Sequence, residues 1–242
     1  MTLLILGGTG EARKLAQCVA KEDISAVLSL AGATRSPAGM TLPTRIGGFG
    51  GAEGFRTFVT EEKISAVLDA THPFASVITD RTFNICQNIG LPYAQLLRPE
   101  WEPGFGDNWT MLSKEEDAAK HVPMGSTVFL GTGRQTLHRF ANLEGCRVIC
   151  RQIDPPTGPF PFEGGEFLVG RPPFPVEHEM ELFRQLGLDY LIVKNAGGAA
   201  SYTKLEAARM IDLPVLMLKR PAMPEAMRFE TVETAMRWIK AL

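Results

Sequence analysis

Short runs of apolar residues alternate with helix-like segments along the whole of this 242-residue chain. Each apolar run is continuous, as in a strand buried on both faces, and the segments between place apolar residues at helical spacing. Repeated strand–helix units predict an α/β fold with parallel sheets covered by helices on both faces. The predicted strands are residues 3–6, 26–30, 66–68, 92–97, 109–112, 127–130, 147–151, 167–169, 190–193 and 214–218, and the predicted helices are 11–20, 55–62, 74–87, 176–186, 201–211 and 231–241, with one more beginning near 135.

The segment 98–108, RPEWEPGFGDN, interrupts this alternation with Pro, Gly and Trp. We therefore predict two Rossmann-like domains, residues 1–100 and 101–242, with mainly parallel sheets and a cleft between them. The strand at 109–112 could belong to either half. Ligands bind beyond the carboxyl ends of the strands in open parallel sheets, so we expect the functional residues in the loops that follow strands.

Charge and apolar patterning disfavour several classes of protein. The net charge of −2 lacks the basic excess of a nucleic-acid binder. The first apolar run, 3–6, is too short for a secretion signal, and no stretch approaches the roughly 20 apolar residues of a membrane-spanning helix. We expect a cytoplasmic protein that binds neither nucleic acid nor membrane, as a monomer or weak oligomer.

Cysteine spacing gives no metal signature. Cys18 and Cys86 fall in apolar helical patterns, and Cys146 and Cys150 flank a strand-like run. No zinc motif has this spacing, and no histidine cluster accompanies it, so we expect no metal site.

A glycine-rich loop follows the first predicted strand, with the sequence GGTGEAR over residues 7–13. Glycines let the backbone turn sharply and approach a diphosphate, and the N-terminus of the next helix supplies free amides. The match to the G-x-G-x-x-G fingerprint is partial, since Arg13 stands at the third position. A plain strand-to-helix turn is the alternative. We predict phosphate binding by Gly8, Thr9, Gly10, Glu11 and Ala12.

The second predicted strand ends without an acidic residue. NAD-binding folds commonly place Asp or Glu there to hold the ribose hydroxyls, whereas this strand ends Ser29-Leu30-Ala31 and is followed by Thr34 and Arg35. An arginine with nearby hydroxyl groups suits the extra phosphate of NADP, and we favour Ser29, Thr34 and Arg35 as its ligands. A solvated arginine in a turn is the alternative.

The third predicted strand leads into the sequence DATHPFA, residues 69–75. Thr71 or His72 could cap the next helix, with Pro73 in its first turn. In this fold the loop faces the ribose and nicotinamide of the cofactor, so we place Ala70, Thr71, His72 and Pro73 at the cofactor. His72 could donate a hydrogen bond or a proton there, and a half-buried capping imidazole is the alternative.

Two strand-end loops of the second half also carry glycine and positive charge. The first contains Gly131, Thr132, Gly133 and Arg134, and the second contains Lys194, Asn195, Gly197 and Gly198. Both combine potential anion-binding backbone with a basic side chain. Arg171, Lys204, Lys219 and Arg220 could add charge nearby. Together these residues predict a substrate with several carboxylates, although each charge alone could be solvated.

Six motifs in order resemble the precorrin-6A reductase family (CobK/CbiJ) of cobalamin biosynthesis. They are GGTGEAR (7–13), DATHPFA (69–75), RPEW (98–101), GTGR (131–134), KNAGG (194–198) and KRP (219–221), and they span most of the chain. DATHPFA and KNAGG are the more specific motifs, since GGTG occurs in many folds.

The resemblance implies a two-domain NADPH-dependent reductase that transfers hydride to precorrin-6A, a tetrapyrrole, and gives precorrin-6B. The first domain would hold NADPH, and the macrocycle with its acetate and propionate groups would lie in the cleft. Hydride addition to a conjugated iminium-like system needs no side-chain nucleophile, so we assign no catalytic residue. His72 and Lys194 are the best candidates for shaping the site.

Three alternatives remain at this point. One is an NADPH-dependent reductase of another anionic substrate. Another is a nucleotide-sugar glycosyltransferase, since glycine loops also bind nucleotide diphosphates. The third is a non-catalytic NADP-sensing domain, which the basic loops of the second half disfavour.

Overall fold

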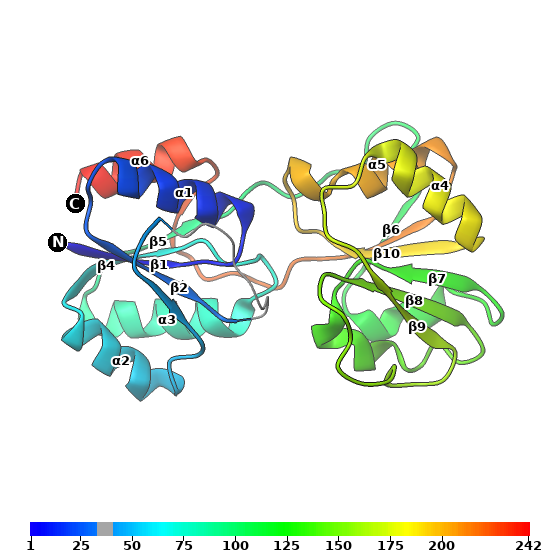
Figure 1. Ribbon diagram of the computed structural model, residues 1–242, viewed down its shortest axis with the longest axis horizontal. Coiled ribbons are helices and arrows are strands. Elements are labelled where there is room, and N and C mark those ends of the chain that lie inside the picture. Colours follow the sequence, from blue (N-terminus) through cyan, green and yellow to red (C-terminus); the bar gives the residue numbers. More distant parts are fainter. Residues whose placement is uncertain (33–40) are drawn as a thin grey trace. The chain divides into compact units, whose positions relative to one another are not determined.

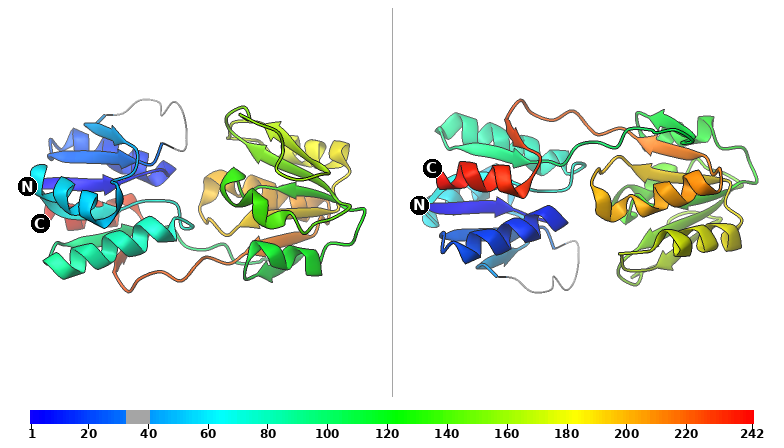
Figure 2. Two further views of the ribbon diagram at one scale, coloured as in Figure 1. Left: turned by 90° about the horizontal axis from the view of Figure 1, so that it is seen from below. Right: turned by 90° about the horizontal axis from the view of Figure 1, so that it is seen from above.

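The computed structural model describes residues 1–32 and 41–242. It divides into two compact units: unit 1 comprises Met1–Pro99 and Pro221–Leu242, and unit 2 comprises Glu100–Arg220 (Figure 1). The chain passes twice between the units, once in each direction (Figure 2). The sequence-based assignment of 221–242 to the second half is therefore corrected. These residues return to unit 1 because a late strand and the last helix complete its sheet and its core.

Unit 1 is built on a six-stranded parallel sheet with the order β3-β2-β1-β4-β5-β12. This is the strand order of a Rossmann fold, with β12 in the sixth place. Helices α1 and α6 cover one face of the sheet, and α2 and α3 cover the other (Figure 1). The bounds are β1 Thr2–Leu6, α1 Gly10–Lys21, β2 Ala26–Leu30, β3 Thr44–Ile46, α2 Gly51–Glu61, β4 Ile64–Asp69, α3 Ser76–Ile89, β5 Tyr93–Leu96, β12 Met227–Phe229 and α6 Val232–Lys240.

Unit 2 repeats this spatial order in a second parallel sheet, β9-β8-β7-β10-β11-β6. Its sixth place is filled by β6, which precedes the other five strands in the chain. Helices α4 and α5 pack on one face against the core of Phe129, Phe183 and Leu205. The bounds are β6 Trp109–Leu112, the 3₁₀ helix η1 Glu115–Lys120, β7 Thr127–Leu130, η2 Arg134–Phe140, β8 Arg147–Gln152, β9 Gly165–Val169, α4 Val176–Leu186, β10 Tyr190–Lys194, η3 Ala199–Ser201, α5 Thr203–Met210 and β11 Val215–Leu218.

The predicted α/β class with two parallel Rossmann-like sheets is confirmed, and the differences are local. The sequence analysis missed β3, β12, η1 and η3, and the helix that it predicted near residue 135 is the 3₁₀ helix η2. The two missed strands have three residues each, too few for a periodicity to show. In the described part of the chain, no helix is long and apolar enough to span a membrane. The cleft between the two units stays a prediction.

Gly7 lets α1 and β2 pack closely at the end of β1. Its amide donates to the Ser29 carbonyl at 2.8 Å. A Cβ atom at Gly7 would lie 2.8 Å from Leu28 Cδ1 and 3.0 Å from Leu30 Cδ2, and Leu28 is a buried core residue. The loop that follows is therefore held by close packing.

We expect the variant Gly7→Ala to lower the free energy of unfolding by about 1–3 kcal/mol, because the new methyl group overpacks a closed core. Urea unfolding of the full chain measures this loss. Gly158→Ala is the matched control, since a Cβ atom at Gly158 meets nothing within 4 Å. Equal stability of the two variants would contradict the packing role of Gly7.

Candidate functional site

The strand order reverses at one point in each sheet, between β1 and β4 in unit 1 and between β7 and β10 in unit 2. Ligands of open parallel sheets bind at such switch points, beyond the carboxyl ends of the strands. The loops that follow these four strands are 7–9, 70–75, 131–133 and 195–198. They contain most of the residues that the sequence analysis singled out, gathered at one switch point in each unit.

The glycine loop of unit 1 has an open face. Gly8 adopts a φ of 135°, which favours glycine, and a Cβ atom at Gly8 or Gly10 would meet nothing within 4 Å. The first amides of α1, those of Gly10 and Glu11, have no acceptor one turn earlier in the helix. The loop thus presents backbone donors and the positive end of a helix dipole to open space, which fits a diphosphate.

Thr9 ties this loop to the loop after β4. Its hydroxyl donates to the Ala70 carbonyl at 2.8 Å and accepts from the Ala12 amide at 3.1 Å, which caps α1. Because the hydroxyl is engaged twice, Thr9 holds the loop in place, and Ala12 is buried beneath it. The carboxylate of Glu11 forms an ion pair with Arg98 at 2.5 Å. The side chains of Thr9 and Glu11 at this loop therefore bind other parts of the protein.

Asp69, at the end of β4, organises the second loop of this switch point. The buried carboxylate accepts hydrogen bonds from the Thr71 amide at 3.0 Å, the Thr79 hydroxyl at 2.7 Å and the Tyr93 hydroxyl at 2.8 Å. Burial, together with the Asp69 charge, raises the pKa of Tyr93 well above its usual range. Tyr93 therefore remains a protonated donor to Asp69, and residues 70–72 start from a fixed position.

The expected helix cap in this loop is wrong. Helix α3 begins at Ser76 with Ala75 as its cap residue, so neither Thr71 nor His72 caps it, and Pro73 precedes the helix. Instead, His72 Nδ1 accepts from the Phe74 amide at 3.2 Å and the His72 carbonyl accepts from the Ala75 amide at 2.8 Å. A neutral imidazole that accepts at Nδ1 carries its hydrogen on Nε2. His72 can therefore act as a donor through Nε2.

The end of β2 is close to an arginine that the sequence analysis did not consider. Arg45, on the adjacent strand β3, donates to the Ser29 hydroxyl at 2.8 Å. Thr34 and Arg35, predicted beside Ser29, lie outside the described residues, so their role stays a prediction. Arg45 sits in the segment TRIGGFG, 44–50, whose arginine before a glycine pair was the available signal.

The first loop of unit 2 comes close to α5. A Cβ atom at Gly131 would lie 3.1 Å from Val193 Cγ1, so this glycine allows the close approach of Val193, and the stem of Lys204 lies at ordinary contact distance, 3.7 Å to its Cδ. Thr132 is buried, and Arg134 is exposed at the first position of η2, after Gly133. The backbone of this loop and Arg134 remain available to a ligand.

Asn195 uses its side chain to hold the chain rather than to face a ligand. Its Oδ1 accepts from the Trp101 amide at 2.8 Å, and its Nδ2 donates to the Trp101 carbonyl at 3.0 Å and to Glu100 Oε2 at 3.2 Å. The Trp101 indole in turn donates to the Gly198 carbonyl at 2.9 Å. The segment 195–198 is thereby anchored to the start of unit 2. Asn195 is better described as a positioning residue.

Lys194 ends β10, half-buried beside Gly197 and Gly198 in sequence. Burial lowers the pKa of Lys194, while the charge of Glu115 acts in the opposite direction. Arg220 donates to the Asn195 carbonyl at 2.9 Å, and Arg171 forms an ion pair with Asp154. Lys194 thus remains the predicted cation of this loop, whereas Arg220 and Arg171 also serve the fold.

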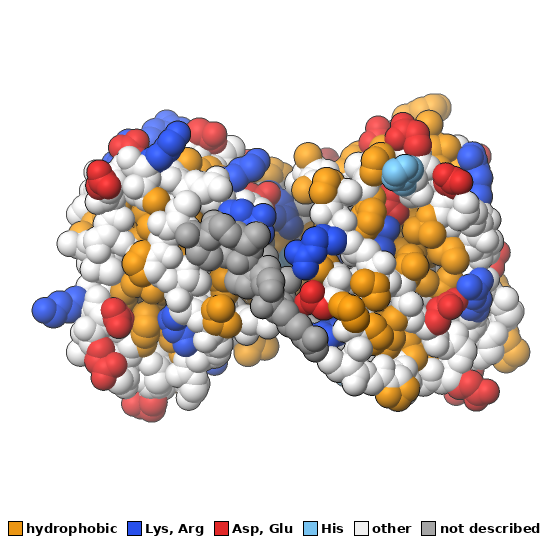
Figure 3. Space-filling model, viewed as in Figure 1, with side chains coloured by type: hydrophobic (Ala, Val, Ile, Leu, Met, Phe, Trp, Pro, Cys, Tyr) orange, Lys and Arg blue, Asp and Glu red, His pale blue; other side chains and the backbone are white. Residues whose placement is uncertain are grey.

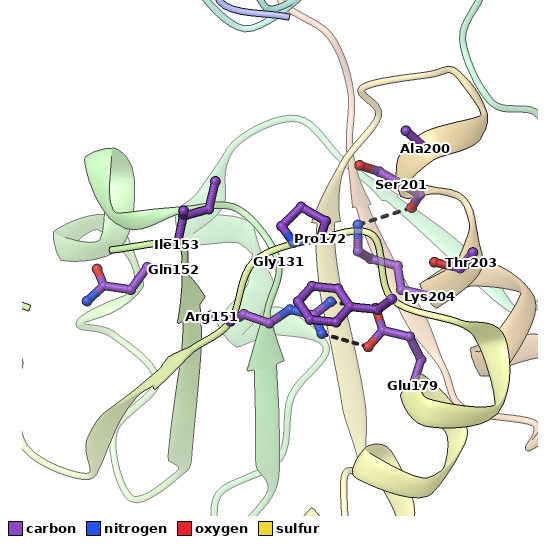
Figure 4. A pocket seen from close by; sticks show the side chains of 12 residues that line it. Gly131, Arg151, Gln152, Ile153, Pro172, Glu179, Ala200, Ser201, Thr203 and Lys204 are labelled. Carbon is purple, nitrogen blue, oxygen red and sulfur yellow. Dashed lines mark hydrogen bonds and ion pairs between the residues drawn. The ribbon is translucent and has the colours of Figure 1, made fainter. Parts of the chain in front are cut away.

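Unit 2 contains a cavity of about 110 Å³ that opens beside Gly131 (Figure 4). Its walls come from the ends of β7, β8 and β9 and the start of α5. Arg151 and Glu179 form a buried bidentate ion pair at 2.6 and 2.7 Å, so their charges cancel. Lys204 rises from α5 and donates to the Ser201 carbonyl at 3.0 Å (Figure 4). The lining residues therefore carry one positive charge in excess, which suits an anion.

The surface of both units mixes Lys and Arg with Asp and Glu in the face drawn in Figure 3. Local charge, as in the Lys204 cavity, is therefore the relevant feature for anion binding. The four cysteines are free, and no group of His, Cys, Asp and Glu suited to a metal occurs among the described residues.

Comparison with known proteins gives a consistent result. A family model described as Precorrin-6x reductase CbiJ/CobK matches residues 2–240. A precorrin-6A reductase from Rhodococcus erythropolis is 42% identical over 243 residues, covering 99% of this chain and 98% of the relative. One from Rhodobacter capsulatus is 39% identical over 238 residues, covering 98% and 95%.

A more distant relative, a cobalt-precorrin-6A reductase from Priestia megaterium, is 26% identical over 251 residues, covering 96% of this chain and 95% of its own. Among solved structures, one titled CobK precorrin-6A reductase superposes with a TM-score of 0.94 at 38% identity, covering 100% of this chain and 96% of that one. The fold described above is therefore shared across the full chain.

We expect the stability of the ligand-free protein to depend on pH through Lys204. Burial lowers its pKa from 10.5 to about 8 in the folded state. Between these values the unfolded chain binds more protons, so the unfolding free energy rises with pH, by up to about 3 kcal/mol. Urea unfolding of wild type and Lys204→Met from pH 7 to 10 measures the difference. Parallel pH profiles of the two proteins would show that Lys204 is not desolvated.

Proposed function

Because the chain belongs to the family of CbiJ/CobK precorrin-6x reductases, we propose that it reduces precorrin-6A to precorrin-6B with NADPH as the hydride source. The enzyme is an oxidoreductase that reduces a carbon–carbon double bond of the macrocycle. The family match favours neither a glycosyltransferase, nor an NADP sensor, nor a reductase of another anion. A nicotinamide cofactor agrees with reductase chemistry, and its identity as NADPH is part of the proposal.

The observation that carries the cofactor proposal is the open glycine loop at the switch point of unit 1. Space above Gly8 and Gly10 admits a diphosphate, and the free amides at the start of α1 are its hydrogen-bond donors. Thr9 and Asp69 fix the two loops that border this space. When bound, NADPH supplies the hydride, and the chain supplies binding and orientation.

The residues after β4 are the ones we assign to the nicotinamide half of the cofactor. Ala70 is held by Thr9, Thr71 by Asp69, and Pro73 is buried, which leaves His72 as the half-buried polar side chain of this loop that we assign to the cofactor. A donor here could hold the carboxamide or hydride acceptor in register. We keep His72 and Lys194 as candidates for shaping the site.

Unit 2 is proposed to bind the acetate and propionate groups of the macrocycle. Its donors are the loop 131–134, with the exposed Arg134, and Lys194 with the backbone at Gly197 and Gly198. The cavity at Lys204 is far above the ~10–15 Å³ that one water needs, yet smaller than the ~300 Å³ of a drug-sized pocket. It therefore suits one carboxylate arm rather than the ring.

The direct test mixes purified protein with precorrin-6A and NADPH. We expect NADPH absorbance to fall with formation of the reduced macrocycle, and no fall when precorrin-6A is omitted. A wild-type protein that is folded by circular dichroism but shows no turnover would contradict the proposed reaction.

We expect Gly10→Ala to weaken NADPH binding by about tenfold or more, the loss of roughly one charge-assisted hydrogen bond, because the methyl group occupies the approach of the diphosphate. Stability should not fall, since the Cβ atom meets nothing within 4 Å and alanine favours a helix. Fluorescence titration with NADPH and thermal unfolding measure the two effects, with Gly158→Ala as the control. Unchanged affinity would remove this loop from the site.

A further inference from the structure

Arg45 is placed at the carboxyl end of the sheet, beside the end of β2. Strand β3 runs parallel to β2 with Arg45 opposite Ser29. The guanidinium Nη1 reaches the Ser29 hydroxyl at 2.8 Å. In dinucleotide-binding sheets the residue at the end of the second strand contacts the ribose that carries the 2′ substituent. The register between β2 and β3 thus brings a positive charge to this end of the sheet.

The partners of Arg45 hold its position without neutralising its charge. The guanidinium donates to the Ser29 hydroxyl, to the Gly47 carbonyl at 3.0 Å and to the Gly48 carbonyl at 2.9 Å, all neutral acceptors. It stacks on the Phe49 ring with 3.9 Å between Cζ and the ring centroid. No carboxylate among the described residues forms an ion pair with it. The site therefore keeps a full positive charge in a fixed orientation.

The Arg45 guanidinium also has N–H groups that these hydrogen bonds do not use. A guanidinium has five N–H groups, and the three bonds above use both hydrogens of Nη1 and one of Nη2. The Nε hydrogen and the second Nη2 hydrogen have no acceptor among the residues that the structure describes. The N–H groups of a guanidinium that remain unused are strong donors to phosphate oxygens. Burial lowers the pKa of Arg45, which reflects the cost of keeping this charge away from water.

We propose that Arg45 binds the 2′-phosphate of NADPH and thereby selects NADPH over NADH. The inference rests on the proposed function, and it assigns cofactor choice to a residue of β3. A carboxylate at the end of β2 would favour the 2′-hydroxyl of NADH. Here the strand ends Ser29-Leu30-Ala31 without an acidic residue, and the guanidinium of Arg45 binds Ser29.

The test compares two ligands that differ by the phosphate in question, 2′,5′-ADP and 5′-ADP, by isothermal titration calorimetry. For Arg45→Met we expect the affinity for 2′,5′-ADP to fall about tenfold to a hundredfold, the size of one strong charge-assisted interaction. The affinity for 5′-ADP should stay close to the wild-type value. If Arg45 served only to hold the loop 47–49, both affinities would fall alike, and that result would overturn the proposal.

Two further variants separate charge from structure. Arg45→Lys keeps the positive charge but lacks the planar, multiple donors of a guanidinium. We therefore expect it to retain part of the preference for 2′,5′-ADP. Arg237→Met removes one exposed positive charge from α6 of the same unit and should leave both affinities unchanged. Thermal unfolding of each variant checks that it is folded. Loss of preference in Arg237→Met as well would show a general charge effect and would contradict a role for Arg45.

Failure of this inference is distinguishable from failure of the proposed function. Wild-type protein is first titrated with NADPH and NADH. If it binds neither, or binds NADH more tightly, the proposed cofactor is wrong and the role of Arg45 is overturned with it. If it prefers NADPH and Arg45→Met keeps that preference, the reductase proposal stands and only the assignment to Arg45 fails.

Discussion

The hydroxyl of Thr9 joins the two loops on which the unit 1 site depends. It caps α1 through the Ala12 amide and reaches across the switch point to the Ala70 carbonyl. A helix cap contributes about 0.5–2 kcal/mol to stability, so this one side chain both fixes the turn before α1 and holds it against the loop after β4. The open space above Gly8 and Gly10 therefore has a rigid floor, which is what tight, oriented dinucleotide binding requires.

The two units share a strand order but differ in what their switch points offer. Unit 1 presents bare backbone at Gly8 and Gly10, which suits a diphosphate that several amides can share. Unit 2 combines glycines with ammonium groups, Lys194 at the end of β10 and Lys204 in the cavity wall. Point charges on flexible stems suit carboxylates at varied positions. One architecture thus offers two different sets of donors for anions, as proposed above for the cofactor and the substrate.

Sequence alone predicted the features that depend on local pattern. The buried strands, the loop at Gly8 and Gly10 and the α/β class follow from apolar runs and glycine placement. The return of 221–242 to unit 1 depends on pairing between β12 and β5, remote in sequence, and no local signal carries it. The strand register places Arg45 opposite Ser29. The side chain of Asn195, predicted to contact the substrate, instead accepts a hydrogen bond from the Trp101 amide. Such outcomes are set by tertiary contacts, which a single sequence does not display.

Arg45 and Lys204 show how the binding of an anion can be linked to the stability of the fold. Each is a positive charge held mainly by neutral acceptors, Arg45 by a hydroxyl and carbonyls and Lys204 by the Ser201 carbonyl. A desolvated charge without a counter-ion costs folding free energy, and an arriving anion removes that cost. Binding should therefore stabilise the fold by linkage, in unit 1 with the cofactor and in unit 2 with the substrate.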